Sequence, residues 1–166
     1  DFFYPVGNYN TKDSHKTEAP DGTTQYAWME GFKLDIPIGE KAVTATGELI
    51  PDYIVSMTER IQGVAQLDSG EFVLSQSYGR KNKSSLLIHS NILETDPVSY
   101  YDVEGELVPM WYLDNTNLEQ EIIMPPMSEG IDSLGDSVYI LYESGANKYR
   151  GNGVDPIDHI FKWEKP

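Results

Sequence analysis

The chain has 166 residues and is 39% hydrophobic, which suffices to bury one core and makes a single domain the expectation. Its 27 acidic and 12 basic side chains give a formal charge of -15, which disfavours nucleic acid and anionic membrane surfaces as partners. With no cysteine, disulfides, thiolate nucleophiles and cysteine-ligated zinc are excluded. A solvated surface explains the acidity most simply; the alternatives are a cationic ligand or a hard divalent cation such as Ca²⁺.

The N-terminus and the longest apolar runs bear on where the protein acts. The chain begins Asp1-Phe2-Phe3-Tyr4, without an initiator Met or a signal-like region, so we expect a processed or excised product of an exported protein. The predicted location is extracellular or in the cell envelope. The longest apolar runs, such as Val138–Tyr142, are far below the roughly 18 residues of a membrane span, so none is expected.

The first sixty residues predict part of a β unit. Phe2–Tyr9 matches a long strand that runs into a Gly-containing loop, and Gln25–Asp35 matches the strand that follows. Ile50–Met57 then predicts an outer strand. We therefore expect the chain to begin inside a repeating unit.

A complete unit of the same kind opens at Ile61. A short strand leads into the turn Asp68-Ser69-Gly70. Glu71–Tyr78 then shows the period-two pattern of side chains that predicts a long strand. A Gly-containing loop and a third strand within Lys83–Asn91 follow. Glu121–Met124 predicts the outer strand.

Proline positions and the lack of helical periodicity support an all-β fold. Pro125-Pro126 directly follows the predicted outer strand, and proline is tolerated at the edge or end of a strand. Pro109 is expected in a turn. No window of a dozen residues carries a convincing apolar stripe at helical spacing, so little helix is expected.

The unit recurs from Ser128 onward. Gln62-Gly63-Val64 matches Glu129-Gly130-Ile131 at an offset of 129 − 62 = 67 residues. Gly79 matches Gly145 at an offset of 145 − 79 = 66. Two landmarks with nearly equal offsets indicate an internal repeat.

Antiparallel four-stranded units with a period above the ~40 to 50 residues of common blades predict a β-propeller-like fold. The predicted segments are 1–60, a partial first blade with its outer strand, 61–127, a complete blade, and 128–166, a partial blade, all in one structural domain. About two and a half blades fall short of the about four to eight that close a ring. The chain is then a fragment, or two copies assemble, or the architecture is a β-sandwich or barrel.

One residue pair resembles a known family. Gln62 and Glu129 begin equivalent strands, and each precedes a glycine. Glu129-Gly130 resembles the Glu-Gly pair that opens a channel-lining strand in gluconolactonase and strictosidine-synthase-like propellers, which implies a metal-ligand role for Glu129, with Ca²⁺ as the cofactor. The alternative is that Glu129 caps a loop or pairs with Arg80 or Arg150.

Two further resemblances bear on this interpretation. The family's other ligands are Asn and Asp residues, for which Asn8 and Asn82 are candidates. The runs Ser77–Asn82 and Glu143–Arg150 are also similar to secreted bacterial propellers of undefined function.

Cationic and aromatic residues follow the long strands at corresponding places. Arg80 and Arg150 would present cations on one face with Tyr78 beside them, and we place Gln62 in the same binding site. Arginine offers a bidentate fork for a carboxylate or phosphate, and aromatic rings suit carbohydrate or peptide. The alternative is that these side chains cover the edge of the core with their stems.

These observations predict an exported propeller segment that binds a small molecule, a carbohydrate or a protein. A metal-dependent lactonase or esterase, in which Glu129 helps to hold a cation that polarises a carbonyl, is the alternative function. A third hypothesis makes the chain a structural part whose partners are the missing blades or a second copy. No nucleophile elbow or phosphate-binding loop is present in the sequence.

Overall fold

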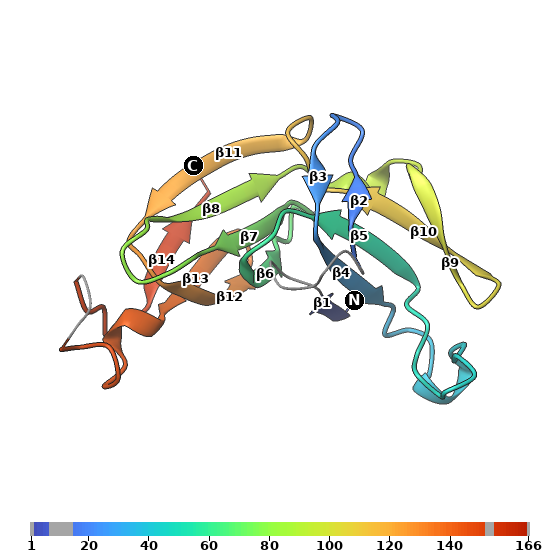
Figure 1. Ribbon diagram of the computed structural model, residues 1–166, viewed down its shortest axis with the longest axis horizontal. Coiled ribbons are helices and arrows are strands. Elements are labelled where there is room, and N and C mark those ends of the chain that lie inside the picture. Colours follow the sequence, from blue (N-terminus) through green and yellow to red (C-terminus); the bar gives the residue numbers. More distant parts are fainter. Residues whose placement is uncertain (1, 7–14, 152–154, 166) are drawn as a thin grey trace. The chain divides into compact units, whose positions relative to one another are not determined.

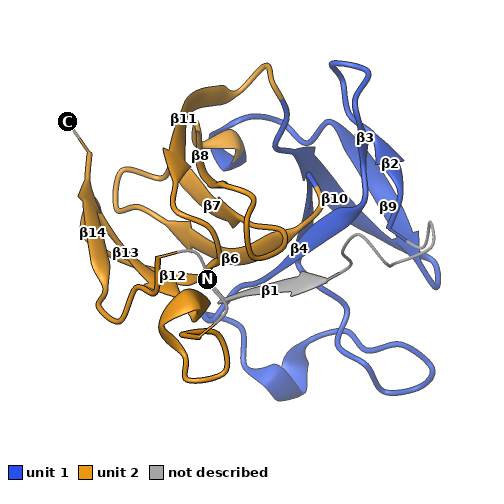
Figure 2. Cartoon of the chain, turned by 60° about the vertical axis from the view of Figure 1, so that its left-hand side comes forward, with its two compact units in different colours: residues 1–58, 93–114 blue, residues 59–92, 115–166 orange. Residues whose placement is uncertain are grey.

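The computed structural model describes residues 2–6, 15–151 and 155–165, which fold into β-strands and three short 3-10 segments (Figure 1). The prediction of an all-β chain with several antiparallel sheets is confirmed, and none of these sheets closes on itself. Two compact units are present (Figure 2). Unit 1 contains residues 1–58 and 93–114, and unit 2 contains residues 59–92 and 115–166. Nowhere in the described ranges is a helix both long and apolar enough to cross a membrane.

Unit 1 is built on a five-stranded sheet in the order β1-β4-β5-β10-β9, with a small β2-β3 hairpin. Neighbours pair antiparallel except β5 and β10, which are parallel. The strands are β1 (Phe2–Val6), β2 (Thr17–Glu18), β3 (Thr24–Gln25), β4 (Ala27–Phe32), β5 (Tyr53–Met57), β9 (Ser99–Val103) and β10 (Glu106–Tyr112). A 3-10 turn, η1 (Ile38–Glu40), lies between β4 and β5, and η2 (Ile92–Glu94) leads toward β9.

The core of unit 1 forms because alternate residues of its strands are apolar and face one side of the sheet. Trp28, Ile54 and Met110 are buried together there. The Trp28 ring meets the rings of His15 and Tyr101 edge-on, each at a centroid distance of 4.7 Å. These contacts cover a residue of β4 with residues distant in sequence, including one from the β9–β10 hairpin.

Unit 2 contains two antiparallel sheets, in the orders β11-β8-β7-β6 and β12-β13-β14. We call them the four-stranded sheet and the three-stranded sheet. Their strands are β6 (Ile61–Gln66), β7 (Phe72–Gln76), β8 (Ser84–His89), β11 (Leu118–Met124), β12 (Ser128–Leu134), β13 (Ser137–Tyr142) and β14 (Phe161–Glu164). The 3-10 turn η3 (Glu143–Gly145) directly follows β13.

The two sheets of unit 2 repeat the same strand pairing. Val64 of β6 faces Leu74 of β7, and Ile131 of β12 faces Ile140 of β13. The offsets are 131 − 64 = 67 and 140 − 74 = 66, the values found for the sequence landmarks. The internal repeat is therefore a repeat of structure, with equal register in both copies.

A shift in register falls at the same place in both copies. In β6 the shift lies between Ile61 and Gly63, and in β12 it lies between Ser128 and Ile131. A bulge of this kind re-aims the side chains at the start of a strand. Gln62 and Glu129, which the sequence places at equivalent positions of the two repeats, lie at these two register shifts.

The two sheets of unit 2 pack against each other through apolar faces. Val73 and Ile88 of the four-stranded sheet share a buried cluster with Val138 and Ile140 of the three-stranded sheet. Period-two alternation places these residues on one face of each strand. Facing sheets of this kind occur in sandwiches as well as between propeller blades.

Polar contacts join the turns at one end of these sheets. Ser69 donates from its Oγ to Asp136 Oδ1 at 2.9 Å, and Ser133 Oγ donates to the Gln66 carbonyl at 2.7 Å. Lys165 pairs with Glu71, and this hydrogen bond lowers the pKa of the Glu71 carboxyl to about 2. These contacts hold the β6–β7 turn and the β12–β13 turn side by side.

Some elements differ from the sequence expectation. Pro109 lies inside β10, opposite Tyr100, and not in a turn. The hairpin of β9 and β10 was not predicted, because charged residues and a proline interrupt its alternation. Gly7, Asn8 and Tyr9 lie outside the described residues.

The close approach of β6 and β12 gives a test of the packing in unit 2. A Cβ on Gly63 would lie 2.7 Å from the Ile131 backbone nitrogen and 3.0 Å from the Glu129 carbonyl oxygen. We expect Gly63→Ala to lower the free energy of unfolding by about 1–3 kcal/mol, because the backbone of β12 must move. Urea unfolding measures this change.

Gly130→Ala is the matched control, since it lies at the equivalent position and a Cβ there meets nothing within 4 Å. We expect a change within about 0.5 kcal/mol for this variant. Equal destabilisation by both substitutions would contradict the proposed role of the Gly63 contact.

Candidate functional site

The first residues of β6 and β12 lie close together. A Cβ on Gly63 would meet the backbone of Glu129 and Ile131, so the predicted pair Gln62 and Glu129 belongs to adjacent strands. Gln62 is exposed, and its Nε2 donates a hydrogen bond to the Ser77 carbonyl at 3.2 Å. The structure therefore places both strand openings at one end of unit 2.

Buried serines hold the start of β12 against the four-stranded sheet. Ser128 and Ser75 share a hydrogen bond between their hydroxyls at 2.8 Å, and the Ser128 backbone nitrogen donates to Ser84 Oγ at 3.2 Å. Ser84 Oγ in turn donates to Ser77 Oγ at 3.0 Å. All four are buried, so these bonds fix the residue directly before Glu129.

Glu129 lies beside a second carboxylate. Partial burial, the charge of Glu143 and a side-chain hydrogen bond with Glu143 together raise the pKa of Glu129 to about 7. Glu143 begins η3, directly after β13. At neutral pH the Glu129 carboxyl is therefore close to its midpoint of protonation.

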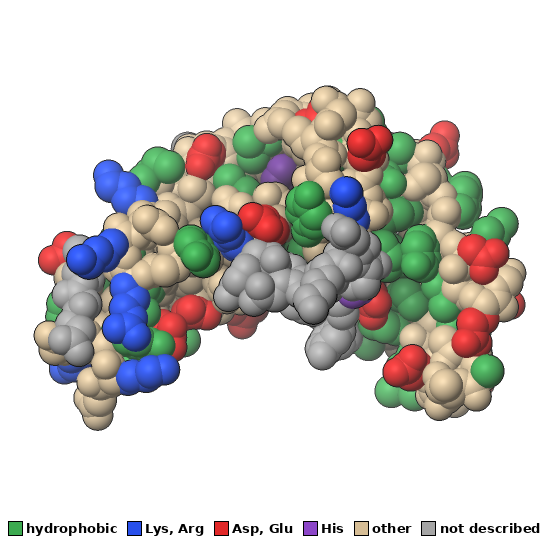
Figure 3. All heavy atoms as spheres, viewed as in Figure 1, with side chains coloured by type: hydrophobic (Ala, Val, Ile, Leu, Met, Phe, Trp, Pro, Cys, Tyr) green, Lys and Arg blue, Asp and Glu red, His purple; other side chains and the backbone are tan. Residues whose placement is uncertain are grey.

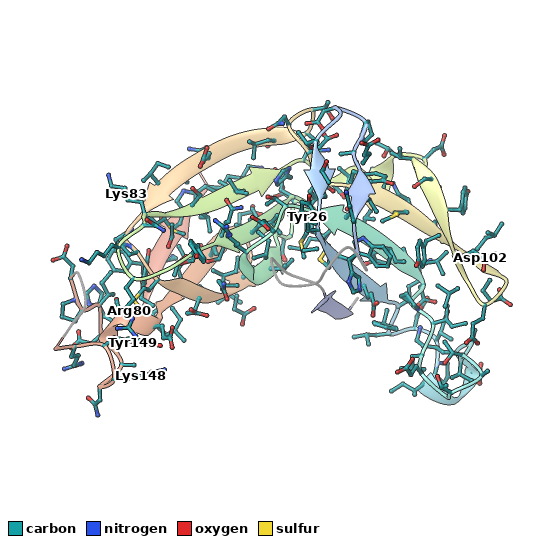
Figure 4. All side chains as sticks on the ribbon, in the orientation of Figure 1. Tyr26, Arg80, Lys83, Asp102, Lys148 and Tyr149 are labelled. Carbon is teal, nitrogen blue, oxygen red and sulfur yellow. The ribbon has the colours of Figure 1, made fainter. Side chains whose placement is uncertain are left out.

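Two cations lie over one aromatic ring near this carboxyl pair. Arg80 Cζ is 4.8 Å from the ring centroid of Tyr149, and Lys148 Nζ is 4.9 Å from it (Figure 4). Tyr149 itself is buried, and both cations are exposed. Cation–π attraction fixes the two charges beside each other in spite of their mutual repulsion.

Glu143 links the carboxyl pair to the cations. The pKa of the Lys148 ammonium is raised by its hydrogen bond with Tyr149 and by the charge of Glu143, while Arg80 opposes this shift. We call these five residues the loop cluster: Glu129, Glu143, Lys148, Tyr149 and Arg80. The β7–β8 loop, the start of β12 and the segment after β13 supply them.

Tyr78 and Arg150 have other contacts. The guanidinium carbon of Arg60 lies 4.0 Å from the ring centroid of Tyr78. Arg150 pairs with Asp158 at 3.0 Å and donates to the Gly145 carbonyl at 2.6 Å. Of the two arginines in the predicted site, Arg150 already pairs with a carboxylate. Arg80 pairs with no carboxylate among the described residues, so its N–H donors can reach a ligand.

Further cations surround Arg80. Lys81 and Lys83 are exposed in the same loop, and no carboxylate among the described residues pairs with Arg80, Lys81 or Lys83. Figure 3 shows most of the blue side chains of that face over unit 2. In a chain of net charge -15, this is a local positive surface.

Two residues that contact the predicted site residues were not predicted from the sequence: Glu143, beside Glu129, and Arg60, over the ring of Tyr78. Glu143 was not considered, although it directly follows β13, whose partner strand β12 carries Glu129 as its second residue. Arg60, which covers Tyr78, has a backbone φ of 67°, a left-handed conformation that no residue pattern announces.

The donor set does not fit the implied Ca²⁺ site. The described ranges contain no group of three or more His, Asp or Glu side chains that could hold a metal ion. Glu129 and Glu143 provide two carboxylates, whereas Ca²⁺ takes about 6–8 oxygen ligands. Asn82 donates its Nδ2 to the Tyr78 carbonyl, and Asn8 lies outside the described residues. We derive no chemical step through a metal.

Comparison with known protein families, curated proteins and solved structures gives no match for this chain.

The Glu129–Glu143 pair predicts a dependence of stability on pH. Folding raises the pKa of Glu129 from 4.5 to about 7, so the folded protein binds more protons than the unfolded chain between these values. The stabilising contribution of protonated Glu129 is complete below pH 4.5 and is lost as the pH rises through 7. At pH 8 we expect Glu129→Gln to be more stable than wild type by on the order of 1 kcal/mol after solvent screening.

Urea unfolding between pH 4.5 and 8 measures this difference. Asp132→Asn removes one negative charge from an exposed position of the same strand and serves as the control. If both variants follow the same pH dependence, the effect comes from net charge and the specific pairing with Glu143 is refuted.

Proposed function

We propose that this chain is a binding protein whose loop cluster binds an anionic group, a carboxylate or a phosphate. The observation that carries this proposal is the exposed pair Arg80 and Lys148, fixed over the buried ring of Tyr149. No carboxylate of the described ranges pairs with Arg80, so its donors are available to a ligand.

Preorganisation favours this function. The planar guanidinium of Arg80 can offer two parallel N–H donors to a carboxylate or phosphate. Because Tyr149 already holds Arg80 and Lys148, little side-chain entropy remains to be lost when a ligand binds. Lys81 and Lys83 add a local field that attracts anions to an otherwise acidic protein.

The repeats themselves are interpreted as propeller blades within this proposal. Equal strand registers, equivalent bulges and face-to-face packing of the two sheets support this interpretation. A sandwich accounts for facing sheets, but it does not require two consecutive segments to repeat one register. The export of the protein stays a prediction from the sequence.

The anion proposal is tested by titrating the protein with inorganic phosphate and with glucuronate, following backbone amide signals by NMR. Both anions should shift signals of residues 79–83 and 143–150, and neutral glucose should not. We expect Arg80→Gln to weaken binding by about tenfold or more, because one charge-assisted contact is lost.

Lys16→Gln is the charge-matched control, since Lys16 is exposed in unit 1 and outside the loop cluster. It should leave the affinity within about twofold at equal ionic strength. Equal weakening by both variants would show a non-specific charge effect, and an absence of anion-dependent shifts would refute the proposed function.

Thermal unfolding with and without Ca²⁺ tests the alternative of a metal-dependent hydrolase. Because two carboxylates do not make a Ca²⁺ site, we expect no rise in Tm on adding the ion. A rise that Glu129→Gln abolishes would contradict this expectation and support the metal-dependent function instead.

A further inference from the structure

The hairpin of β9 and β10 in unit 1 carries apolar side chains on the face that its core does not use. Successive residues of a strand point to opposite faces, and directly opposed residues share a face. Tyr100 lies opposite Pro109, and Asp102 lies opposite Leu107. The same alternation along β10 adds Trp111. We call these five residues the hairpin face: Tyr100, Asp102, Leu107, Pro109 and Trp111.

The two faces of the hairpin differ in burial. Val108 and Met110, on the other face, are buried in the core of unit 1. On the hairpin face, Leu107 is 65% exposed and Tyr100 is 60% exposed. Neighbouring exposed apolar side chains of this kind mark interaction surfaces more often than scattered single ones do.

Several hydrogen bonds hold the hairpin face in place. Glu104 and Gly105 form the turn, both with positive φ, and the Gly105 nitrogen donates to Asp102 Oδ1 at 2.7 Å. The Ala45 nitrogen donates to Glu104 Oε2 at 2.6 Å, which ties the turn to the segment between β4 and β5. Because the surface is already ordered, little conformational entropy is lost when a partner binds to it.

The charges around the hairpin face are all negative. Residues 93–114 contain no lysine or arginine and six acidic residues, of which only Asp114 is buried: Glu94, Asp96, Asp102, Glu104, Glu106 and Asp114. Among the described residues, no lysine or arginine pairs with Asp96 or Asp102. Figure 3 likewise shows green and red side chains at the hairpin end of the view, without blue ones.

Two of these carboxylates lie at opposite ends of the hairpin face. Asp102 is next to the turn, opposite Leu107 (Figure 4). At the other end, Trp111 donates from its Nε1 to the Thr95 carbonyl at 3.1 Å, which places the adjoining Asp96 there. From Leu107 to Trp111 the strand rises about 13 Å, the length of four extended residues.

We propose that the hairpin face binds a basic segment of a partner protein. Apolar side chains of that segment cover Leu107 and Tyr100, and a lysine or arginine on each side of them pairs with Asp102 and Asp96. Charge complementarity selects this partner, because an apolar surface bordered only by carboxylates attracts cations and repels acidic chains. The spacing of the two ends predicts cations about four to six residues apart in an extended segment.

The exposed side chains favour a peptide over a carbohydrate. Of the two aromatic rings on the hairpin face, only that of Tyr100 is exposed, and the most exposed side chain is the aliphatic Leu107. An apolar centre with a charged border is the usual composition of a protein interface. The hairpin face shares no residue with the loop cluster, so this inference is independent of anion binding.

A capped peptide with the sequence Lys-Leu-Pro-Leu-Val-Lys tests the proposal by NMR titration of the full chain. It should shift the amide signals of residues 99–111. A peptide with glutamate in place of both lysines should not bind, and one with serine in place of leucine and valine should bind at least about fivefold more weakly. These comparisons leave the protein itself unaltered.

Two substitutions test the protein side of the contact. Leu107→Ser should weaken binding of the first peptide by about fivefold, because an apolar contact is lost. Its control is Leu141→Ser, since Leu141 is 55% exposed in unit 2. Asp102→Asn removes the charge but keeps an acceptor for the Gly105 nitrogen, and it should weaken binding by about threefold or more. Asp132→Asn is its control in unit 2.

An absence of shifts in residues 99–111 would overturn the proposal, and so would equal affinities of the lysine peptides with and without leucine and valine. Equal weakening by a variant and its control would show a non-specific effect and would also overturn it. Shifts of the same signals by cellobiose but not by the peptide would replace the peptide with a carbohydrate. A dimer of the chain that Leu107→Ser dissociates would refute a partner protein in favour of a second copy.

Discussion

The arrangement of unit 2 depends on the close approach of β6 and β12, which a glycine at position 63 permits. No side chain separates the two strands there, so the backbones of Gly63, Glu129 and Ile131 come into contact. The turn contacts from Ser69 to Asp136 and from Lys165 to Glu71 fix the other end of the same strands. With both ends fixed, the loops after β7 and β13 are brought to the same side, which allows Arg80 and Lys148 to share the ring of Tyr149.

Two glutamates of unit 2 have pKa values shifted in opposite directions. Glu71 is stabilised in its charged form by Lys165, so this pair acts as a structural contact between turns. Burial and Glu143 instead raise the pKa of Glu129 and favour its neutral form. The charge of Glu143 acts on Lys148, and Lys148 shares the ring of Tyr149 with Arg80, so these loops carry both cations and a titrating acid.

The internal repeat and the all-β class could be predicted from the sequence. Both depend on the local alternation of apolar and polar residues and on the offsets between matching sequence landmarks. Val64–Leu74 and Ile131–Ile140 show that those offsets correspond to equal registers. The β9–β10 hairpin could not be predicted, since Pro109 lies within a strand and residues 93–114 join unit 1 by contacts distant in sequence. At the site, the sequence predicts Arg80 on one surface with Arg150 and Tyr78. The contacts of Arg80 and Lys148 with Tyr149, and the pairing of Glu129 with Glu143, depend instead on tertiary contacts that no spacing encodes.

The two repeats differ at matching positions of a common strand framework. Gly79 and Gly145 match in sequence, yet Gly79 has a positive φ of 72° and Gly145 lies against the Ile157 carbonyl. The same repeat position carries neutral Gln62 in one copy and the titrating Glu129 in the other. Equal strand registers accommodate either residue, so the packing of the two sheets does not by itself require an acid at position 129.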